Sequence, residues 1–279
     1  MVVERKRSTG LRPLLRGLGF CATLLGSSLF ASGLAAQDRD WGFGDDWVGF
    51  IALGAAAAPD YEGSDEYEAV PLPIARVRSG SVAIEVEGLG GRVDLSPYEG
   101  FGFGPAINYR FGRDNVDDPQ VSQLSDIDNS LELGGFLRFG QPLGLTSGDE
   151  AVLRLDVLAD VLNGHSGVIA TTSAAYTLRP LQRLGLTFGA STTWMSEDYA
   201  QSFFSISAAD SARSGLPAYD ADSGLRDASI NLLATYALTE RWGLIAIAST
   251  GFLLGEAADS PVVKSRTQFF GGLALSYSF

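Results

Sequence analysis

The sequence predicts an all-β protein, a transmembrane antiparallel up-and-down β-barrel of about 12 strands, and three observations lead to this fold class. Residues 1–35 have the composition of an export signal. Beyond them, apolar residues occupy every second position in one segment after another, as they do along β-strands. No later apolar run is long enough for a membrane-spanning helix, so a closed barrel is the remaining way to satisfy every backbone amide inside a bilayer.

The predicted signal peptide spans residues 1–35. Five basic residues precede its apolar stretch: Arg5, Lys6, Arg7, Arg12 and Arg16. The stretch itself, residues 17–33, is uncharged but diluted with glycine and serine, whereas a membrane anchor needs about 20 strongly apolar residues. Small residues follow it, so we expect cleavage after Ala35 or Ala36 and an exported mature chain, residues 36–279, that forms a single outer-membrane barrel.

The mature chain is acidic and contains no cysteine. Cys21 lies inside the predicted signal, where Phe20 is too large for the small residue that a lipoprotein signal requires, so the mature chain can form no disulfide. The formal net charge of −13 becomes −17 when five basic side chains and one acid leave with the signal. Because nucleic-acid binding depends on Lys and Arg that neutralise phosphates, we expect no nucleic-acid partner.

The last segment of the chain shows the alternation most clearly. One face carries Thr267, Phe269, Gly271, Leu273, Leu275, Tyr277 and Phe279, and the other carries Arg266, Gln268, Phe270, Gly272, Ala274, Ser276 and Ser278. The same period recurs over residues 101–111, 131–139, 153–162, 184–194 and 227–238, whereas residues 46–58 and 70–79 alternate poorly. Aromatic residues at strand ends, with charges and glycines on the narrow face, favour a lipid-facing barrel over a soluble sandwich or lipocalin-like protein.

The order of long and short connections predicts the strand count. Long connections are expected at residues 59–69, 112–127, 198–224 and 256–264, and short turns at residues 79–80, 96–100, 141–150, 179–183 and 239–241. In outer-membrane barrels the long loops face outward and the short turns face the periplasm. Two further outer turns, at residues 88–91 and 163–166, keep long and short connections alternating, and they bring the total to 12 strands.

The face that the alternation assigns to the lumen carries charges of both signs: Glu85, Glu87, Arg92, Asp94, Arg110, Glu132, Arg138, Arg154, Asp156, Asp160, Asp227 and Arg266. Buried unpaired charge is costly, so these residues should pair or contact water. Two interpretations remain open, a salt-bridged plug that stiffens a closed barrel and a narrow hydrated pore. Arg110 and Glu132 flank one hairpin loop, and we expect them to pair on the inner wall.

The connection at residues 198–224 is long for a compact fold. Four of its apolar side chains are candidates for a loop directed into the lumen: Phe203, Phe204, Ile206 and Leu216. They are too apolar for a freely solvated loop, so we expect the loop to fold into the barrel mouth and narrow it; the alternative is packing on neighbouring outer loops only. Residues 207–213 favour a short helical turn that Gly215 and Pro217 end.

The final predicted strand ends on an aromatic residue. Leu275, Tyr277 and Phe279 match the pattern that the barrel assembly machinery reads as an insertion signal. We therefore expect that machinery to be a partner, and we expect deletion of Phe279 to reduce the yield of protein in the outer membrane.

Two segments carry side chains with candidate chemistry. Asn163, His165 and Ser166 could form a hydrolase site, but they crowd into one predicted turn, where Asn and Ser are ordinary turn formers. An acid-rich loop could bind a divalent cation: it contains Asp60, Glu62, Asp65, Glu66 and Glu68. Its spacing fixes no ligand geometry, so a solvated loop near lipopolysaccharide is favoured. We predict no catalytic residue, no metal site and no cofactor.

Three ordered blocks resemble the MipA/OmpV family of outer-membrane proteins. They are residues 58–65 (APDYEGSD) with Tyr67 and residues 71–73, residues 104–105 with residues 109–114 (YRFGRD), and residues 214–220 (SGLPAYD) with residues 224–225 and Tyr236. The resemblance implies a barrel in the outer membrane of a Gram-negative bacterium. It also implies a link to a murein-degrading lytic transglycosylase and a scaffold role between murein hydrolases and synthases; other members are linked to osmotic adaptation or adhesion. The family offers no agreed catalytic residues to carry over.

The favoured function is therefore a scaffold or envelope-organising barrel linked to peptidoglycan enzymes. The alternative is a narrow, porin-like channel for small solutes, and a barrel-wall hydrolase is less favoured. The expected partners are outer-membrane lipid and lipopolysaccharide, the barrel assembly machinery, and a murein transglycosylase or synthase.

Overall fold

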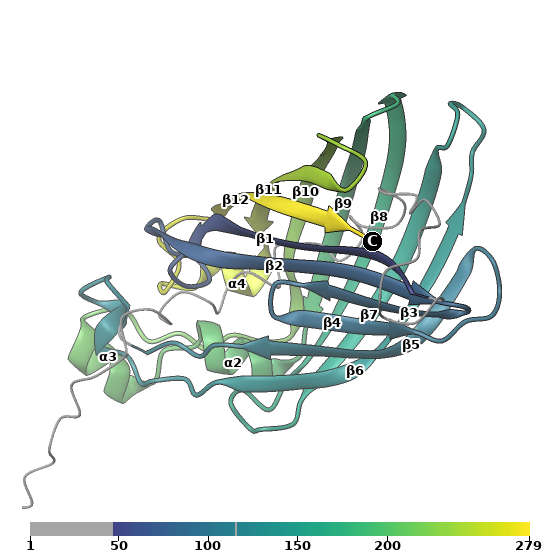
Figure 1. The fold of residues 1–279 in the computed structure, drawn as a ribbon. Coiled ribbons are helices and arrows are strands. Elements are labelled where there is room, and N and C mark those ends of the chain that lie inside the picture. The colour runs from purple at the N-terminus through teal and green to yellow at the C-terminus, as the bar shows by residue number, and fades with distance from the viewer. Residues whose placement is uncertain (1–46, 115) are drawn as a thin grey trace, which may run out of the picture.

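The computed structural model describes residues 47–114 and 116–279, which form a closed barrel of 12 strands (Figure 1). Each strand pairs antiparallel with its neighbours in sequence, and β1 pairs with β12 to close the barrel. The predicted fold class and strand number are confirmed. The predicted signal peptide lies outside the described residues.

The turns between the strands fall where the sequence predicts them. The strands are β1 (Val48–Pro59), β2 (Tyr67–Ser79), β3 (Val82–Glu87), β4 (Gly90–Asp94), β5 (Phe101–Arg110), β6 (Ser130–Gln141), β7 (Glu150–Asp160), β8 (Val168–Leu181), β9 (Leu184–Met195), β10 (Gly224–Ala237), β11 (Trp242–Leu253) and β12 (Thr267–Ser278). The β3–β4 turn contains Gly88, whose φ of 58° lies in the left-handed region that glycine adopts readily. This turn and the β7–β8 turn are the two that the strand count required.

The outer face of the barrel is apolar. Leu53, Leu153 and Leu273 come from three different strands and are 68%, 58% and 59% exposed. Trp242 and Tyr277 form an edge-on aromatic pair with ring centroids 5.0 Å apart. Large exposed apolar side chains around the wall, with aromatic residues near a strand end, are the arrangement expected of a sheet that faces lipid.

The inner face differs between the two sides of the barrel. Inward residues of β1, β2, β10, β11 and β12 form one apolar cluster, hereafter the apolar half: Phe50, Ala52, Ala56, Ala58, Val70, Leu72, Ile74, Leu233, Ile245, Ile247, Phe270 and Ala274. Of the eight buried Asp, Glu and Arg residues that lie on the described strands, six are on β3 to β7, hereafter the charged half. The interior is thus occupied by packed side chains on one side and by ion pairs on the other.

The three longest connections, β5–β6, β9–β10 and β11–β12, lie at one end of the barrel, the loop end, together with the β1–β2, β3–β4 and β7–β8 connections. The remaining turns lie at the other end, the turn end. The loop end carries η1 (Val121–Gln123), α2 (Glu197–Phe204), α3 (Ala208–Ser214) and α4 (Gly255–Asp259) (Figure 1). The predicted helical turn is confirmed as α3: Ser207 accepts a hydrogen bond from the amide of Asp210, and Gly215 ends the helix with φ of 74°. In the described ranges, no helix combines the length and apolar character needed to cross a membrane.

Candidate functional site

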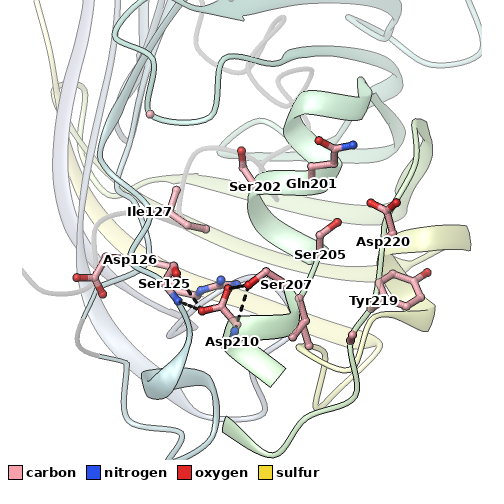
Figure 2. Close-up of a pocket in the computed structure, with 14 residues that line it drawn as sticks. Ser125, Asp126, Ile127, Gln201, Ser202, Ser205, Ser207, Asp210, Tyr219 and Asp220 are labelled. Atoms are coloured by element: carbon pink, nitrogen blue, oxygen red, sulfur yellow. Dashed lines mark hydrogen bonds between the residues drawn. The ribbon is translucent and has the colours of Figure 1, made fainter. Parts of the chain in front are cut away.

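Cavities open at both ends of the barrel. The loop-end cavity has a volume of about 690 Å³ and lies between the β5–β6 and β9–β10 connections (Figure 2). The turn-end cavity has a volume of about 480 Å³. Its charged lining residues are Arg76, Arg78, Asp94, Glu99, Arg138 and Glu150. Two groups of buried ion pairs occupy the inner wall, and they form the core of the candidate site.

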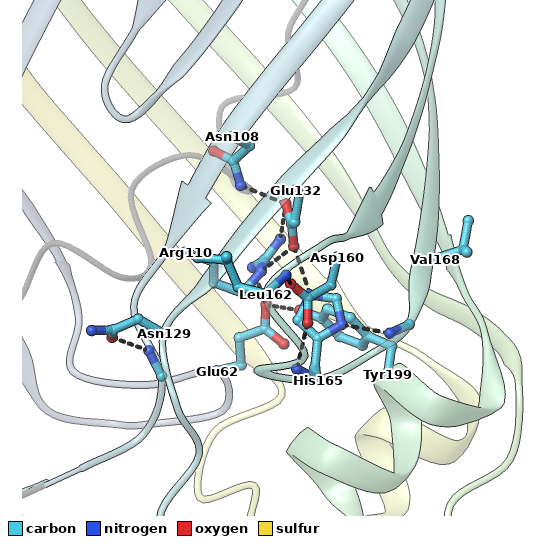
Figure 3. A network of polar contacts seen from close by, with 12 residues as sticks. Glu62, Asn108, Arg110, Asn129, Glu132, Asp160, Leu162, His165, Val168 and Tyr199 are labelled. Atoms are coloured by element: carbon cyan, nitrogen blue, oxygen red, sulfur yellow. Dashed lines mark hydrogen bonds and ion pairs between the residues drawn. The ribbon is translucent and has the colours of Figure 1, made fainter.

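The first group, the loop-end cluster, joins polar and charged side chains that are far apart in sequence (Figure 3). Its members are Glu62 from the β1–β2 loop, Asn108 and Arg110 from β5, Glu132 from β6, His165 from the β7–β8 turn, Tyr199 from α2, and Arg226 and Asp227 from β10. All of these side chains are buried. The cluster ties one strand-to-strand loop and one helix to the opposite walls of the barrel.

Glu132 is the best-satisfied carboxylate of this cluster. Its Oε1 accepts from Arg110 Nε at 2.6 Å, and its Oε2 accepts from Asn108 Nδ2 at 2.6 Å and from Arg110 Nη2 at 3.3 Å. The residue has no exposed surface. The predicted pairing of Arg110 with Glu132 is confirmed, and its two-point geometry is the strong form of a guanidinium–carboxylate contact.

His165 completes the shell of Glu132. Its Nε2 lies 3.0 Å from Glu132 Oε1, and its Nδ1 accepts a hydrogen bond from the amide of Gly167 at 3.0 Å. Because Nδ1 accepts, the ring proton must sit on Nε2, and His165 donates it to Glu132. The ring is therefore a neutral donor that fixes the β7–β8 turn onto the inner wall.

Glu62 links the two sides of the cluster through a single oxygen. Its Oε1 accepts from Tyr199 Oη at 2.8 Å, from Arg226 Nη1 at 3.1 Å and from Arg110 Nη1 at 3.3 Å. Arg226 also donates its Nε to Asp227 at 2.6 Å. Burial raises the pKa of Tyr199, so its hydroxyl stays protonated and donates to Glu62.

Tyr199 also packs its ring among cations and aromatic rings. The guanidinium carbons of Arg110 and Arg226 lie 5.3 Å and 5.6 Å from the centre of the ring. Phe203 stacks on it at 4.6 Å, and His165 meets it edge-on at 4.9 Å. Cation–π contacts of this kind gain strength when water is excluded, so α2 is held to the inner wall by both packing and charge.

The second group, the mid-barrel cluster, crosses the charged half. Arg92 contacts Asp156 at 2.6 Å and Glu87 at 3.1 Å. Glu85 lies 3.5 Å from Arg76 and 3.7 Å from Arg154. The guanidinium nitrogens of Arg154 are buried and have no hydrogen-bond partner among the described residues, so this cluster leaves donor capacity unfilled.

The remaining predicted lumen charges lie nearer the strand ends. Arg138 pairs with Glu150 at the turn end. Asp94 accepts hydrogen bonds from the amides of Ser96 and Phe103, and Asp160 accepts from the amides of Leu162, His165 and Ser166. These two carboxylates therefore hold turns.

Arg266 is a correction to the predicted lumen set. It precedes β12, its side chain is 66% exposed, and it pairs with Asp259 at 2.9 Å on the surface of the loop end. The strand begins one residue later than the alternation suggested, so the side chain belongs to a loop and not to the inner wall.

The four candidate residues of the long loop are all buried, but they divide between two clusters. Phe203 and Phe204 pack with Ile169 of β8 and Met195 of β9, at the rim of the barrel. Ile206 and Leu216 pack instead with apolar side chains of the other long connections: Tyr61, Val121, Leu124 and Val262. The first half of the loop thus contacts the barrel wall, and the second half contacts other loops.

The segment considered for hydrolysis is a turn. Asn163 and Ser166 adopt positive φ values of 61° and 55°, and both are exposed. His165 points into the barrel with both ring nitrogens engaged. Across residues 47–114 and 116–279, no group of three or more His, Cys, Asp or Glu side chains is arranged to hold a metal ion.

The expectation of a solvated acidic loop is wrong for Glu62. Asp65 and Glu66 are exposed, but Glu62 is only 7% exposed because two arginines on opposite walls attract it inward. Helix α2 is not among the elements predicted from the sequence. Its signal was present in Ser196, which precedes the helix, and in the two acids Glu197 and Asp198 of its first turn.

Arg226 was missed for a different reason. Strict alternation places Asp227 inward and its neighbour Arg226 outward. A β-bulge shifts the register between Leu225 and Asp227, so both charged residues are buried. No residue pattern in the sequence marks this bulge.

The predicted insertion signal lies on strand β12 and beyond it. Leu275 is 49% exposed, and Tyr277 packs against Trp242. The backbone of Phe279 exchanges two hydrogen bonds of 3.0 Å with Gly49. Recognition of these residues by the assembly machinery stays a prediction.

Comparison with known protein families gives a match over most of the chain. The model of a family described as MltA-interacting protein MipA matches residues 51–279. A protein named YiaT from Escherichia coli (strain K12), whose descriptive name places it in the outer membrane, is 28% identical over 127 residues. That match covers 46% of this chain and 51% of YiaT, so the chain matches about half the length of this relative.

Solved structures with a similar trace are barrels of the outer membrane. An outer membrane channel (COG4313) from Pseudomonas putida F1 has a TM-score of 0.47 and 11% identity, covering 88% of this chain and 99% of the channel. The outer membrane channel DcaP of Acinetobacter baumannii has a TM-score of 0.39 and 10% identity, covering 84% of this chain and 96% of DcaP. Scores this low carry no argument about function. The family model matches well over half of the sequence and therefore shows the family: the chain belongs to the MltA-interacting protein MipA family and is an outer-membrane β-barrel.

Proposed function

We propose that the protein is a closed outer-membrane barrel that serves as an envelope scaffold for a murein transglycosylase. The observation that carries this proposal is the filled interior. The apolar half packs large side chains inside the barrel, and the loop-end cluster ties α2 across to both walls. A barrel whose interior is filled with packed and paired side chains is rigid. A rigid barrel is suited to anchor a partner protein and to present a docking surface.

The turn end supports a docking role. In an outer-membrane barrel the short turns face the periplasm, where murein enzymes work. This end carries the cavity with three arginines and three acids, which Tyr98 also lines while being 69% exposed. Exposed tyrosine and arginine are the residue types that protein interfaces favour. The family description, which names an interaction with MltA, agrees with a transglycosylase as the partner.

A pull-down from solubilised membranes tests this role. Full-length protein should retain a membrane-bound murein transglycosylase, and a double variant at the turn end, Arg78→Glu with Tyr98→Ala, should retain at most about a tenth as much, as expected for loss of interface anchors. The matched control is Arg266→Glu, which makes the same charge change at the loop end and should bind normally. Equal retention by all three proteins, or retention by none, would contradict the proposal.

A narrow channel is the second candidate, and one observation favours it. The contacts that close the loop end come from a connecting loop, through Tyr199 and Phe203. The mid-barrel cluster behind them is polar, with Arg154 donors left unfilled. If the loop opens, the charged half would line a hydrated path.

Planar-bilayer recordings separate the two candidates. A closed scaffold should give no conductance steps, either as wild type or after deletion of residues 202–214. A gated channel should give steps after that deletion and rare openings before it. The Arg266→Glu protein serves again as the control for insertion.

We propose no catalytic role for the β7–β8 turn, since His165 is buried against Glu132 whereas the neighbouring Ser166 is exposed. The apolar outer face fits contact with outer-membrane lipid. We also propose lipopolysaccharide and the barrel assembly machinery as partners.

A further inference from the structure

The loop-end cavity is a second candidate site, separate from the clusters inside the barrel. The β5–β6 connection supplies Arg113, Ser125 and Asp126, and the β9–β10 connection supplies most of the other wall (Figure 2). Its volume of about 690 Å³ lies within the range of about 300–1,000 Å³ that small-ligand sites occupy. Neither the scaffold nor the channel role makes use of it.

Arg113 is an unpaired cation in the wall of this cavity. The residue is 8% exposed, and its Nη1 donates to the carbonyl oxygen of Phe203 at 2.9 Å. Its Nε has no hydrogen-bond partner, and among the described residues no carboxylate lies within ion-pair distance of it. Burial lowers the pKa of Arg113 to about 10, which leaves it protonated at neutral pH. Buried cations are normally paired, so this one is missing an anionic partner.

The wall around Arg113 is firmly held. Its backbone exchanges hydrogen bonds of 3.0 and 3.1 Å with Ile127. Asp210, which also lines the cavity, is already engaged by the hydroxyls of Ser125 and Ser207 and by Arg213. Asp210 is therefore occupied in holding α3 to the β5–β6 connection.

The opposite side of the cavity carries a different charge. Asp220 is exposed and lies with Gln201 and Ser205 away from the side that holds Ser125, Ile127 and Asp210 (Figure 2). Hydroxyls of Ser202 and Ser205 lie along the α2 side. The cavity lining thus combines one cation, Arg113, with three carboxylates, Asp126, Asp210 and Asp220, and of these Asp220 lies away from the side that holds Asp210.

We propose that this cavity binds a short peptide with free termini, with its carboxylate on Arg113 and its ammonium group at Asp220. A guanidinium that forms no ion pair within the described residues suits a carboxylate ligand, to which it can donate charge-assisted hydrogen bonds. A purely anionic ligand would be repelled by Asp126 and Asp220 and by a chain of net charge −13. The cavity volume of about 690 Å³ leaves room for a ligand larger than a single amino acid.

Three probes test the assignment on full-length protein refolded in detergent, with binding measured by calorimetry at pH 7. The probes are trialanine, N-acetyl-trialanine and trialanine amide. Trialanine carries both charges, and each of the others lacks one. We expect trialanine to bind at least about tenfold more tightly than either blocked peptide, the change that loss of one charge-assisted contact produces.

Two variants assign each end of the peptide. Arg113→Gln should weaken trialanine binding by about tenfold and should also make trialanine and its amide equivalent, since the carboxylate contact is gone. Asp220→Asn should make trialanine and N-acetyl-trialanine equivalent. Arg266→Gln, at an exposed pair on the same end of the barrel, should leave all three affinities unchanged.

Comparing the three probes distinguishes the loss of one terminal contact from a general loosening of the loop. A disordered loop would weaken all three probes by the same factor, whereas the proposal requires that discrimination at one terminus be lost and discrimination at the other be kept. Equal binding of the three probes to the wild-type protein, or unchanged discrimination in both variants, would overturn the proposal.

Discussion

The apolar half and the charged half of the barrel belong to one sheet, yet they are stabilised by different means. In the apolar half, residues such as Leu72 and Ile245 pack as they would in a soluble core. In the charged half, Arg110 and Glu132 are buried and must satisfy each other. A substitution in the apolar half should therefore lower the stability through lost packing. A substitution in the charged half should lower it by leaving a buried partner unpaired.

The largest effect should come from removing one member of the loop-end cluster. We expect Glu132→Leu to lower the free energy of unfolding by about 3–5 kcal/mol, because Arg110 would remain buried without its main counter-ion. Glu132→Gln keeps one acceptor oxygen for Arg110 and His165 and should cost less. The midpoint of urea unfolding in lipid vesicles, followed by the shift in gel mobility, measures both. A leucine variant as stable as the glutamine variant would show that the cluster is not stabilising through charge.

The matching change in the apolar half should cost somewhat less. Leu72 has no exposed surface, and Leu72→Ala should lower the stability by about 2–4 kcal/mol through lost apolar contact and the cavity left behind. The same unfolding assay applies, with a second set of measurements at high salt. The loss at Leu72 should not change with salt, and a strong salt dependence would contradict the packing explanation.

The smallest effect should come from an exposed ion pair. Arg266→Gln removes a contact with Asp259 in which both side chains are about two-thirds exposed. Such surface pairs contribute about 0–1 kcal/mol, so the variant should unfold close to wild type. A loss comparable to that of Glu132→Leu would mean that Arg266 has a role beyond this pair.

The same contrast explains how far the sequence could predict the fold. Strands β5, β6 and β7 were easy to place, because polar inward residues such as Asn108, Arg154 and Asp156 contrast with apolar outward ones. Residues 46–58 and 70–79 alternate poorly because β1 and β2 line the apolar half. There Ala52, Leu72 and their inward neighbours are as apolar as the lipid-facing side chains. Connection lengths still gave the right strand count, since they do not depend on the contrast between faces.

The candidate site was less predictable. Pairing of Arg110 with Glu132 follows from two adjacent strands in known register. Contacts of Glu62 with Arg226 and Tyr199 join segments separated by 164 and 137 residues, and no local pattern encodes them. The β-bulge that turns Arg226 inward is likewise a property of the backbone pairing and not of the residue order.

Glu62 has a consequence for how the barrel assembles. It draws together Arg110 on β5 and Arg226 on β10, which share no strand pairing and meet only across the enclosed interior. In an open sheet Arg110 could still pair with Glu132 of the neighbouring strand, and Arg226 with the adjacent Asp227. Closure of the ring therefore adds the shared contact with Glu62, which links the two local ion pairs across the interior.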